Sequence, residues 1–166
     1  HDPASHAFVR TPRSETMYGP PWRLYVYRIH GHYSANIVTG PTESAAAVLL
    51  RAGRVISGSR IARERRGDVD EEHLARGPGN LAKALGITMD DLGVNVLESE
   101  SVRLGPEVPK PGVPAYEIYS GPRVGVRKAA DWPWRLWLAN ERSVSAYRRH
   151  PQAESTQGPM SGELSV

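Results

Sequence analysis

The sequence predicts an α+β fold: a mixed, mostly antiparallel sheet with a protruding β-hairpin and helices at its periphery. Segments in which residues alternate with period two outnumber helical segments, and short turns link them, which favours antiparallel pairing. The chain of 166 residues is near the size of one domain and is long enough to bury about 70% of its unfolded surface. We therefore expect a single domain over residues 1–150.

The clearest predicted element is a hairpin over residues 23–39. It follows a stretch rich in Pro, Gly, Ser and His that predicts irregular backbone. The alternation places Tyr25, Tyr27 and Ile29 on one face of the first strand and Leu24, Val26 and Arg28 on the other. A turn at 30–32 joins the two strands, and Gly31 supplies the positive φ that a tight turn needs.

The rest of the chain is divided by glycine and proline signals. Asp68 and Glu71 have the spacing of a capping box, Gly77-Pro78-Gly79 breaks the helix that follows, and Gly86 ends the next one. The expected elements are a strand at 44–52, helices at 59–66, 68–76 and 80–85, a helical turn at 88–92, and strands at 94–97, 116–119, 123–126 and 134–138. Residues 151–166 are rich in Gln, Ser, Gly, Pro and Glu, which predicts a disordered tail.

The composition excludes several functional classes. The chain has no cysteine, which excludes disulfides, iron–sulfur clusters, thiolate zinc sites and cysteine nucleophiles. No apolar run approaches the roughly 20 residues that a membrane-spanning helix needs, so we expect no association with a membrane.

Charge is strongly segregated along the chain, although the net charge is only +3. Residues 1–66 hold ten arginines against four acidic residues, residues 67–117 hold ten acidic against four basic residues, and residues 118–166 hold seven basic against four acidic residues. Of the 21 basic residues 18 are arginine, whose planar guanidinium suits phosphate oxygens. Two basic flanks fit a polyanionic partner, and the alternative is an ordinary solvated surface.

Three small motifs allow both a chemical and a structural interpretation. His30 and His32 have the spacing of two metal ligands on one strand, but no cysteine or third histidine lies near them in the sequence. Ser5-His6 with Asp2 supplies the residue types of a catalytic triad without a nucleophile elbow or an oxyanion loop. The segment Gly77-Pro78-Gly79-Asn80 presents amides for a phosphate or forms a plain helix break and cap.

The hairpin carries the most informative pattern. An exposed hairpin with a planar side chain at its tip and arginines nearby suits insertion into a DNA groove. Tyr25 and Tyr27 behind the tip would form a wall on which an extruded base stacks. The alternative is that both tyrosines only pack the sheet.

The sequence also resembles the alkyladenine (3-methyladenine) DNA glycosylase family. The resemblance covers about 150 residues and rests on motifs that occur in order. They are DPASHAF at 2–8, RTPR at 10–13, MYGPP at 17–21, LYVYRIHGHYSANIV at 24–38, AAVLLRA at 46–52, ARGPGNLAKALGI at 75–87, GPRVGVRKAADWPWRLWL at 121–138 and SVSAYRRH at 143–150.

The resemblance implies a monofunctional DNA repair enzyme with one compact domain around a curved antiparallel sheet. Such an enzyme flips an alkylated purine, of the 3-methyladenine or 7-methylguanine type, out of the duplex and hydrolyses its N-glycosidic bond without a metal or cofactor. His6 falls on the base-contacting histidine of the family and Tyr27 on the tyrosine that stacks on the flipped base. Asn36 falls on the pocket floor, Arg51 beside the nucleophilic water, and His30 on the wedge, which is usually Tyr.

The chain departs from the family in three places, one of which is an RTPR loop that is about one residue short after Phe8. The family activates its water with the glutamate of a Glu-Ala-Tyr motif located before the histidine that His6 matches, and only five residues precede His6. We therefore expect an N-terminally truncated homologue that lacks its general base and is nearly inactive. The chain also has one residue fewer than the family between Gly31 and Asn36, and a one-residue shift reverses the facing of a strand side chain unless a bulge absorbs it.

The predicted partner is double-stranded DNA with alkylated bases, bound by a monomer in the cytoplasm near the nucleoid. Two alternatives stay open at this point. A non-catalytic binder of damaged or bent DNA would bind without base release, and a module without a nucleic-acid role would show no salt-dependent binding to DNA.

Overall fold

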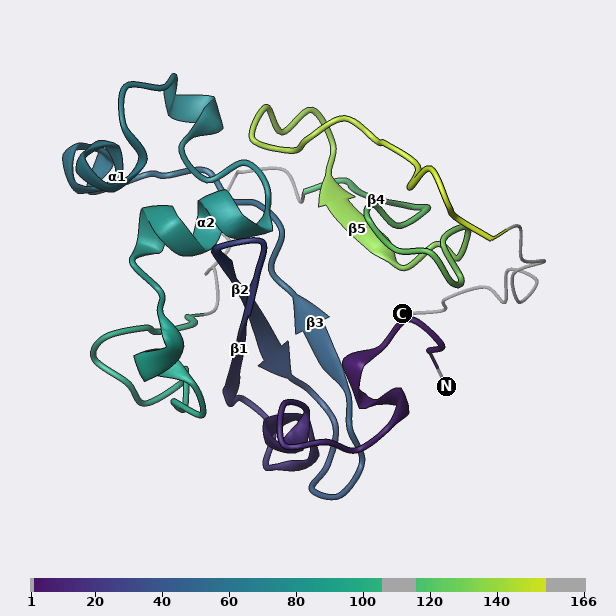
Figure 1. The fold of residues 1–166 in the computed structure, drawn as a ribbon. Helices are drawn as coiled ribbons and strands as arrows, with labels where there is room; N and C mark the ends of the chain where they lie inside the picture. The colour runs from purple at the N-terminus through teal and green to yellow at the C-terminus, as the bar shows by residue number, and fades with distance from the viewer. Residues whose placement is uncertain (1, 106–115, 155–166) are drawn as a thin grey trace.

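The computed structural model describes residues 2–105 and 116–154 and has the predicted α+β fold. Its described strands are all antiparallel and fall into two sheets rather than one (Figure 1). The first sheet contains β1 (Leu24–Ile29), β2 (His32–Val38) and β3 (Ala47–Leu49), and the second contains β4 (Ile118–Gly121) and β5 (Arg135–Leu138). The helices are α1 (Ser59–Arg66) and α2 (Pro78–Leu85). Single 3-10 turns lie at His6–Phe8, Glu15–Tyr18, Glu71–His73 and Met89–Asp91.

The hairpin of β1 and β2 closes through a two-residue turn, as the glycine signal predicts. The register runs from Leu24 opposite Ile37 to Ile29 opposite His32. The turn residues His30 and Gly31 both have positive φ, 48° and 81°. Positive φ at both positions is typical of a type I′ turn, whose twist matches that of the strands it joins.

The two faces of the hairpin pack against different parts of the chain. The aliphatic face contributes Leu24, Val26, Ala35 and Ile37 to a core that includes Ala82, Ile87 and Val96. The tyrosine face contributes Tyr25 and Val38 to a second cluster, which Met17 and Ala7 of the N-terminal segment complete. Both faces are therefore covered at the base of the hairpin, and the N-terminal segment is the cover on the tyrosine side.

Helix α2 supports the hairpin on its aliphatic side. A Cβ atom on Gly79 would lie 3.0 Å from Cβ of His32, so β2 and α2 approach closely at this glycine. The side chains of His30 and His32 nevertheless remain exposed to solvent. Gly86 ends α2 with φ of 75°, a left-handed conformation that disfavours any residue with a side chain.

Several predicted boundaries are wrong in the first part of the chain. The strand expected at 44–52 has only the three residues of β3, although Leu50 N still donates to Ala35 O at 3.0 Å. The helix expected at 68–76 is one 3-10 turn, because Arg63 and Arg66 donate to the carbonyl oxygens of Val69 and Leu74. The helix expected at 80–85 begins at Pro78. Proline suits the first position of a helix, because the N–H group that it lacks would have no partner within the helix there.

The later strand boundaries also differ from the prediction. Residues 94–97 make one isolated bridge, between Arg23 and Asn95, and 123–126 form no strand, with Gly125 at φ of 78°. The strands expected at 116–119 and 134–138 are β4 and β5 with shifted ends. Of the predicted tail 151–166, residues 155–166 lie outside the described residues, and Glu154 N donates to Arg127 O at 2.8 Å.

Candidate functional site

The tyrosine face of the first sheet brings the predicted site residues into two neighbouring rows. Tyr25 lies opposite Asn36 and Tyr27 opposite Ser34. The pairing of Leu50 N with Ala35 O extends the register by one step beyond β3 and places Arg51 opposite Ser34. Because directly opposed residues of antiparallel strands share a face, Tyr27 and Arg51 lie in one row and Asn36 in the next.

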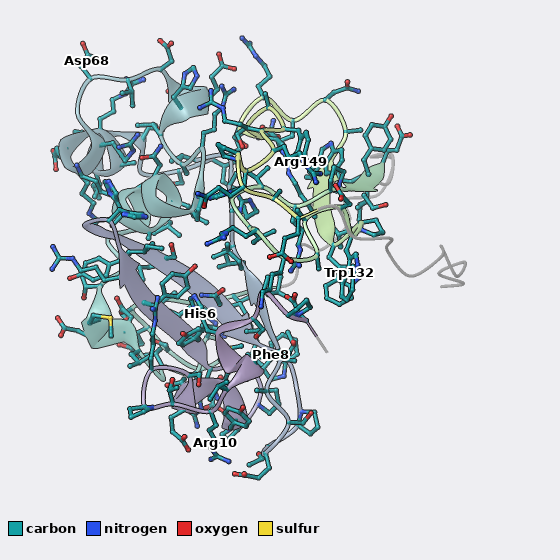
Figure 2. All side chains as sticks on the ribbon, turned by 45° about the vertical axis from the view of Figure 1, so that its right-hand side comes forward. His6, Phe8, Arg10, Asp68, Trp132 and Arg149 are labelled. Atoms are coloured by element: carbon teal, nitrogen blue, oxygen red, sulfur yellow. The ribbon has the colours of Figure 1, made fainter. Side chains whose placement is uncertain are left out.

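His6 is held over this face by the first 3-10 turn. Ser5 caps the turn, with Ala7 N donating to Ser5 Oγ at 3.1 Å. The His6 Nδ1 atom lies 3.0 Å from Oη of Tyr25, and the His6 ring meets the Tyr27 ring edge-on at 4.5 Å between centroids. Figure 2 shows His6 beside the hairpin strands, well away from Asp68. His6, Tyr25 and Tyr27 therefore form one aromatic cluster, in which Tyr27 is half-buried.

Burial and a nearby cation control ionisation in the aromatic cluster. Partial burial, and then the charge of Arg13, lower the pKa of His6 below 6.5. Burial raises the pKa of Tyr25 above 10.0, against a smaller lowering by Arg13. Both shifts favour the neutral form, so His6 and Tyr25 add no charge of their own to the aromatic cluster at neutral pH.

The lowered pKa of His6 predicts a pH dependence of stability. The unfolded state binds more protons than the folded state between the two pKa values, so the free energy of unfolding falls as pH drops from 6.5 toward the folded pKa. Above this window His6 makes no pH-dependent contribution. An NMR titration of the His6 ring should give a midpoint below 6.5, and Arg13→Gln should raise it by removing a like charge. A midpoint at or above 6.5 in the unmodified chain would contradict this description of the cluster.

Arg51 supplies a half-buried cation next to the cluster. Desolvation, and then the charge of Arg135, lower the pKa of the Arg51 guanidinium, while Tyr27 opposes the shift. Within 2–105 and 116–154, Arg51 makes no hydrogen bond or ion pair, and Arg135 donates only to Ser145 O at 2.6 Å. Two neighbouring guanidiniums without a carboxylate partner make a strongly positive site, suited to an anion or to an oriented water molecule.

Asn36 is buried on the tyrosine face, so the shorter connection after Gly31 does not turn it away from Tyr25. Its Nδ2 donates to Tyr25 O at 3.0 Å. This hydrogen bond fixes the amide beneath the cluster. The Oδ1 atom of Asn36 accepts no hydrogen bond from any residue in 2–105 or 116–154, so it is available to a ligand.

The alternative chemical interpretations of the small motifs are not supported. The described residues hold no group of three His, Asp or Glu side chains that fits a metal ion. Asp2 accepts from Arg123 at 2.6 and 2.9 Å and from Ala4 N at 2.9 Å, and Ser5 is a turn cap, so neither forms a triad with His6. Asn80 donates to Arg76 O at 2.7 Å, which favours the plain helix break at 77–80. No helix in the described part of the chain is long and apolar enough to cross a membrane.

Sequence reasoning missed two cations at the site, Arg13 and Arg135. The guanidinium carbon of Arg13 lies 5.1 Å from the centroid of the Tyr27 ring, and Arg13 influences both His6 and Tyr25. The RTPR motif contained Arg13, but its position over a ring depends on how the N-terminal segment crosses the sheet. No carboxylate contacts the aromatic cluster among the residues that the structure describes.

Comparison with known families identifies the class of protein. The model of the methylpurine-DNA glycosylase family matches residues 1–142. The chain belongs to this family, whose members are DNA glycosylases that act in DNA repair. Its substrate is accordingly DNA.

Mycobacterial relatives agree with this assignment. A candidate 3-methyladenine DNA glycosylase of Mycobacterium sp. (strain KMS) is 50% identical over 163 residues, which is 95% of this chain and 76% of the relative. A protein of the same description from Mycobacterium leprae (strain Br4923) is 51% identical over 92% of this chain and 70% of its own length. One from Mycobacterium tuberculosis (strain ATCC 25177 / H37Ra) is 50% identical over 92% of this chain and 74% of its own length.

Proposed function

We propose that the protein releases alkylated purines of the 3-methyladenine and 7-methylguanine type from DNA after flipping them out of the duplex. The observation that carries the proposal is the half-buried Tyr27 ring, with His6 at its edge and the unpaired Arg51 in the same row. A flipped purine would stack on Tyr27 and contact His6. Asn36 below would meet the base edge and disfavour the amino group of unmodified guanine.

The chemistry of the lesion fits this arrangement. A purine alkylated at N3 or N7 is a cation while it is bonded to the sugar, so it is a good leaving group. An aromatic face attracts a desolvated cation by about 2 kcal/mol, and extrusion of a badly paired base costs less than extrusion of a paired one. In the hydrolysis, water adds to C1′ of the sugar as the bond to the base breaks. Arg51 would orient that water.

We propose further that residues 1–150 form the repair domain, that it acts as a monomer on double-stranded DNA near the nucleoid, and that it needs no metal or cofactor. His30 would fill the gap that the flipped base leaves in the stack, since it is exposed at the tip of the β1–β2 turn. A planar ring suits that position, and a protonated ring would also be attracted to the phosphates.

Substitution of His30 tests the wedge. His30→Asn should weaken binding to a duplex with an alkylated purine several-fold, because base–aromatic stacking contributes about 1–3 kcal/mol. Asparagine tolerates the positive φ of 48° at this position, so the turn is preserved, and His30→Tyr, which restores the usual family residue, should retain binding. Equal affinity of His30→Asn and the unmodified chain, measured by fluorescence anisotropy, would remove the wedge role.

A second candidate function is a binder of damaged or bent DNA that does not release bases. It requires only the exposed arginine over Tyr27 and the exposed hairpin tip at His30, and no general base. Incubation of an alkylated duplex with the chain, followed by quantification of abasic sites, separates the two functions. The glycosylase proposal expects abasic sites once a general base is supplied, and the binder expects affinity without them.

A further inference from the structure

The RTPR loop holds two arginines that stack on tyrosines but differ in their partners. The guanidinium carbon of Arg10 lies 4.4 Å from the Tyr18 ring centroid, and that of Arg13 lies 5.1 Å from the Tyr27 centroid. Arg10 is neutralised by Glu15 at 2.5 Å and by Glu43 at 2.6 Å. Arg13 is exposed and forms no ion pair with any described carboxylate. Figure 2 shows Arg10 at the bottom of the view, below His6 and Phe8.

Arg13 therefore places an uncompensated cation on the Tyr27 ring. An exposed cation–π contact is weak, and Arg13 is otherwise held at the cluster by a side-chain hydrogen bond with Tyr25. The ring already holds a cation in the unliganded protein, which indicates that it accepts positive charge. Two cations at the same ring would repel each other, so a cationic ligand on Tyr27 requires Arg13 to move.

We infer that Arg13 is the resting occupant of the Tyr27 ring and exchanges with the flipped base. As the alkylated purine takes the ring, the released guanidinium binds a DNA phosphate, the nearest anion that a duplex offers to an exposed cation. This inference rests on the proposed function, because it requires that the base bind at Tyr27. Arg13 would then be a positioning residue: as the base enters the site, the Arg13 guanidinium binds the sugar–phosphate backbone of the DNA.

The exchange predicts effects of opposite sign for Arg13→Gln. Binding of 7,9-dimethyladeninium, a cation that reproduces an N7-alkylated adenine without DNA, should tighten about two- to fivefold, because its competitor on the ring is removed. Binding of an alkylated duplex should weaken, and the slope of log affinity against log salt should fall by about one, because one phosphate contact is lost. NMR titration of the Tyr27 ring signals measures the first effect, and fluorescence anisotropy at several salt concentrations measures the second.

Matched variants separate the possible outcomes. Arg10→Gln removes a stacked arginine from the same loop and should change neither measurement appreciably, since Arg10 is already neutralised. The neutral 9-methyladenine should gain much less than the cation from Arg13→Gln. If Arg13→Gln weakens both ligands, or strengthens both, the exchange is overturned. If Tyr27→Ala leaves binding of 7,9-dimethyladeninium unchanged, the proposed base site itself is wrong. If Tyr27→Ala weakens that binding but Arg13→Gln does not change the two affinities in opposite directions, only the exchange is overturned.

Discussion

Replacement of Tyr27 by alanine is expected to lower the affinity for a duplex with an alkylated purine by about ten- to a hundredfold. The reason is the loss of one base–aromatic stack, which contributes about 1–3 kcal/mol. Binding of an undamaged duplex should change little, because phosphate contacts dominate it. Fluorescence anisotropy with the two duplexes at one salt concentration gives the ratio directly.

Tyr27→Phe is the matched control for this loss. Phenylalanine retains the ring that stacks on the base and meets His6, so it should bind the alkylated duplex nearly as well as the unmodified chain. Thermal unfolding of both variants separates loss of the stack from loss of the fold, since Tyr27 also packs beside Tyr25 and Met17. An equal loss of affinity for damaged and undamaged duplexes in Tyr27→Ala would contradict a role in base binding.

Supplying a general base is expected to have the largest effect on catalysis. The described residues bring no carboxylate to the aromatic cluster, and Asp2 is bound to Arg123. Fusing a family segment that carries Glu-Ala-Tyr before His1 should raise the rate of abasic-site formation by about 10²–10⁴, the usual contribution of general-base catalysis. Arg51 and Arg135, which lack carboxylate partners in the described part of the chain, would stabilise the added carboxylate.

The control is the same fused segment with glutamine in place of the glutamate. It provides the same segment without the base, so abasic sites should form at the rate that the chain alone gives. Equal rates for the glutamate and glutamine fusions would contradict general-base catalysis at this site. No release by either fusion, with affinity for the lesion retained, would favour the non-catalytic binder.

Local patterns in the sequence predicted the part of the site that lies on the hairpin. Strict alternation over β1 placed Tyr25 and Tyr27 on one face, and Gly31 marked the turn that exposes His30. These features depend on neighbouring residues only, so a pattern of period two is sufficient to find them. The facing of Asn36 could not be predicted in this way, because the chain has one residue fewer than the family between Gly31 and Asn36, and only the strand register places it opposite Tyr25.

Features that depend on contacts between distant segments could not be predicted in this way. The helix expected at 68–76 is replaced by one turn, because guanidiniums of α1 bind its carbonyl oxygens. Arg13 reaches Tyr27 only because the N-terminal segment folds over the sheet. The capping box expected from Asp68 and Glu71 is also wrong, since the turn begins after Asp70 and that residue makes no side-chain cap hydrogen bond.

The most direct test of base binding at Tyr27 is an NMR measurement on a complex with a duplex that contains 2′-fluoro-7-methyldeoxyguanosine. The 2′-fluorine blocks cleavage, so the cationic base stays attached to DNA. Nuclear Overhauser contacts from the 7-methyl protons to the rings of Tyr27 and His6 are the expected result. Contacts from those protons only to the neighbouring stacked bases of the duplex would contradict the account.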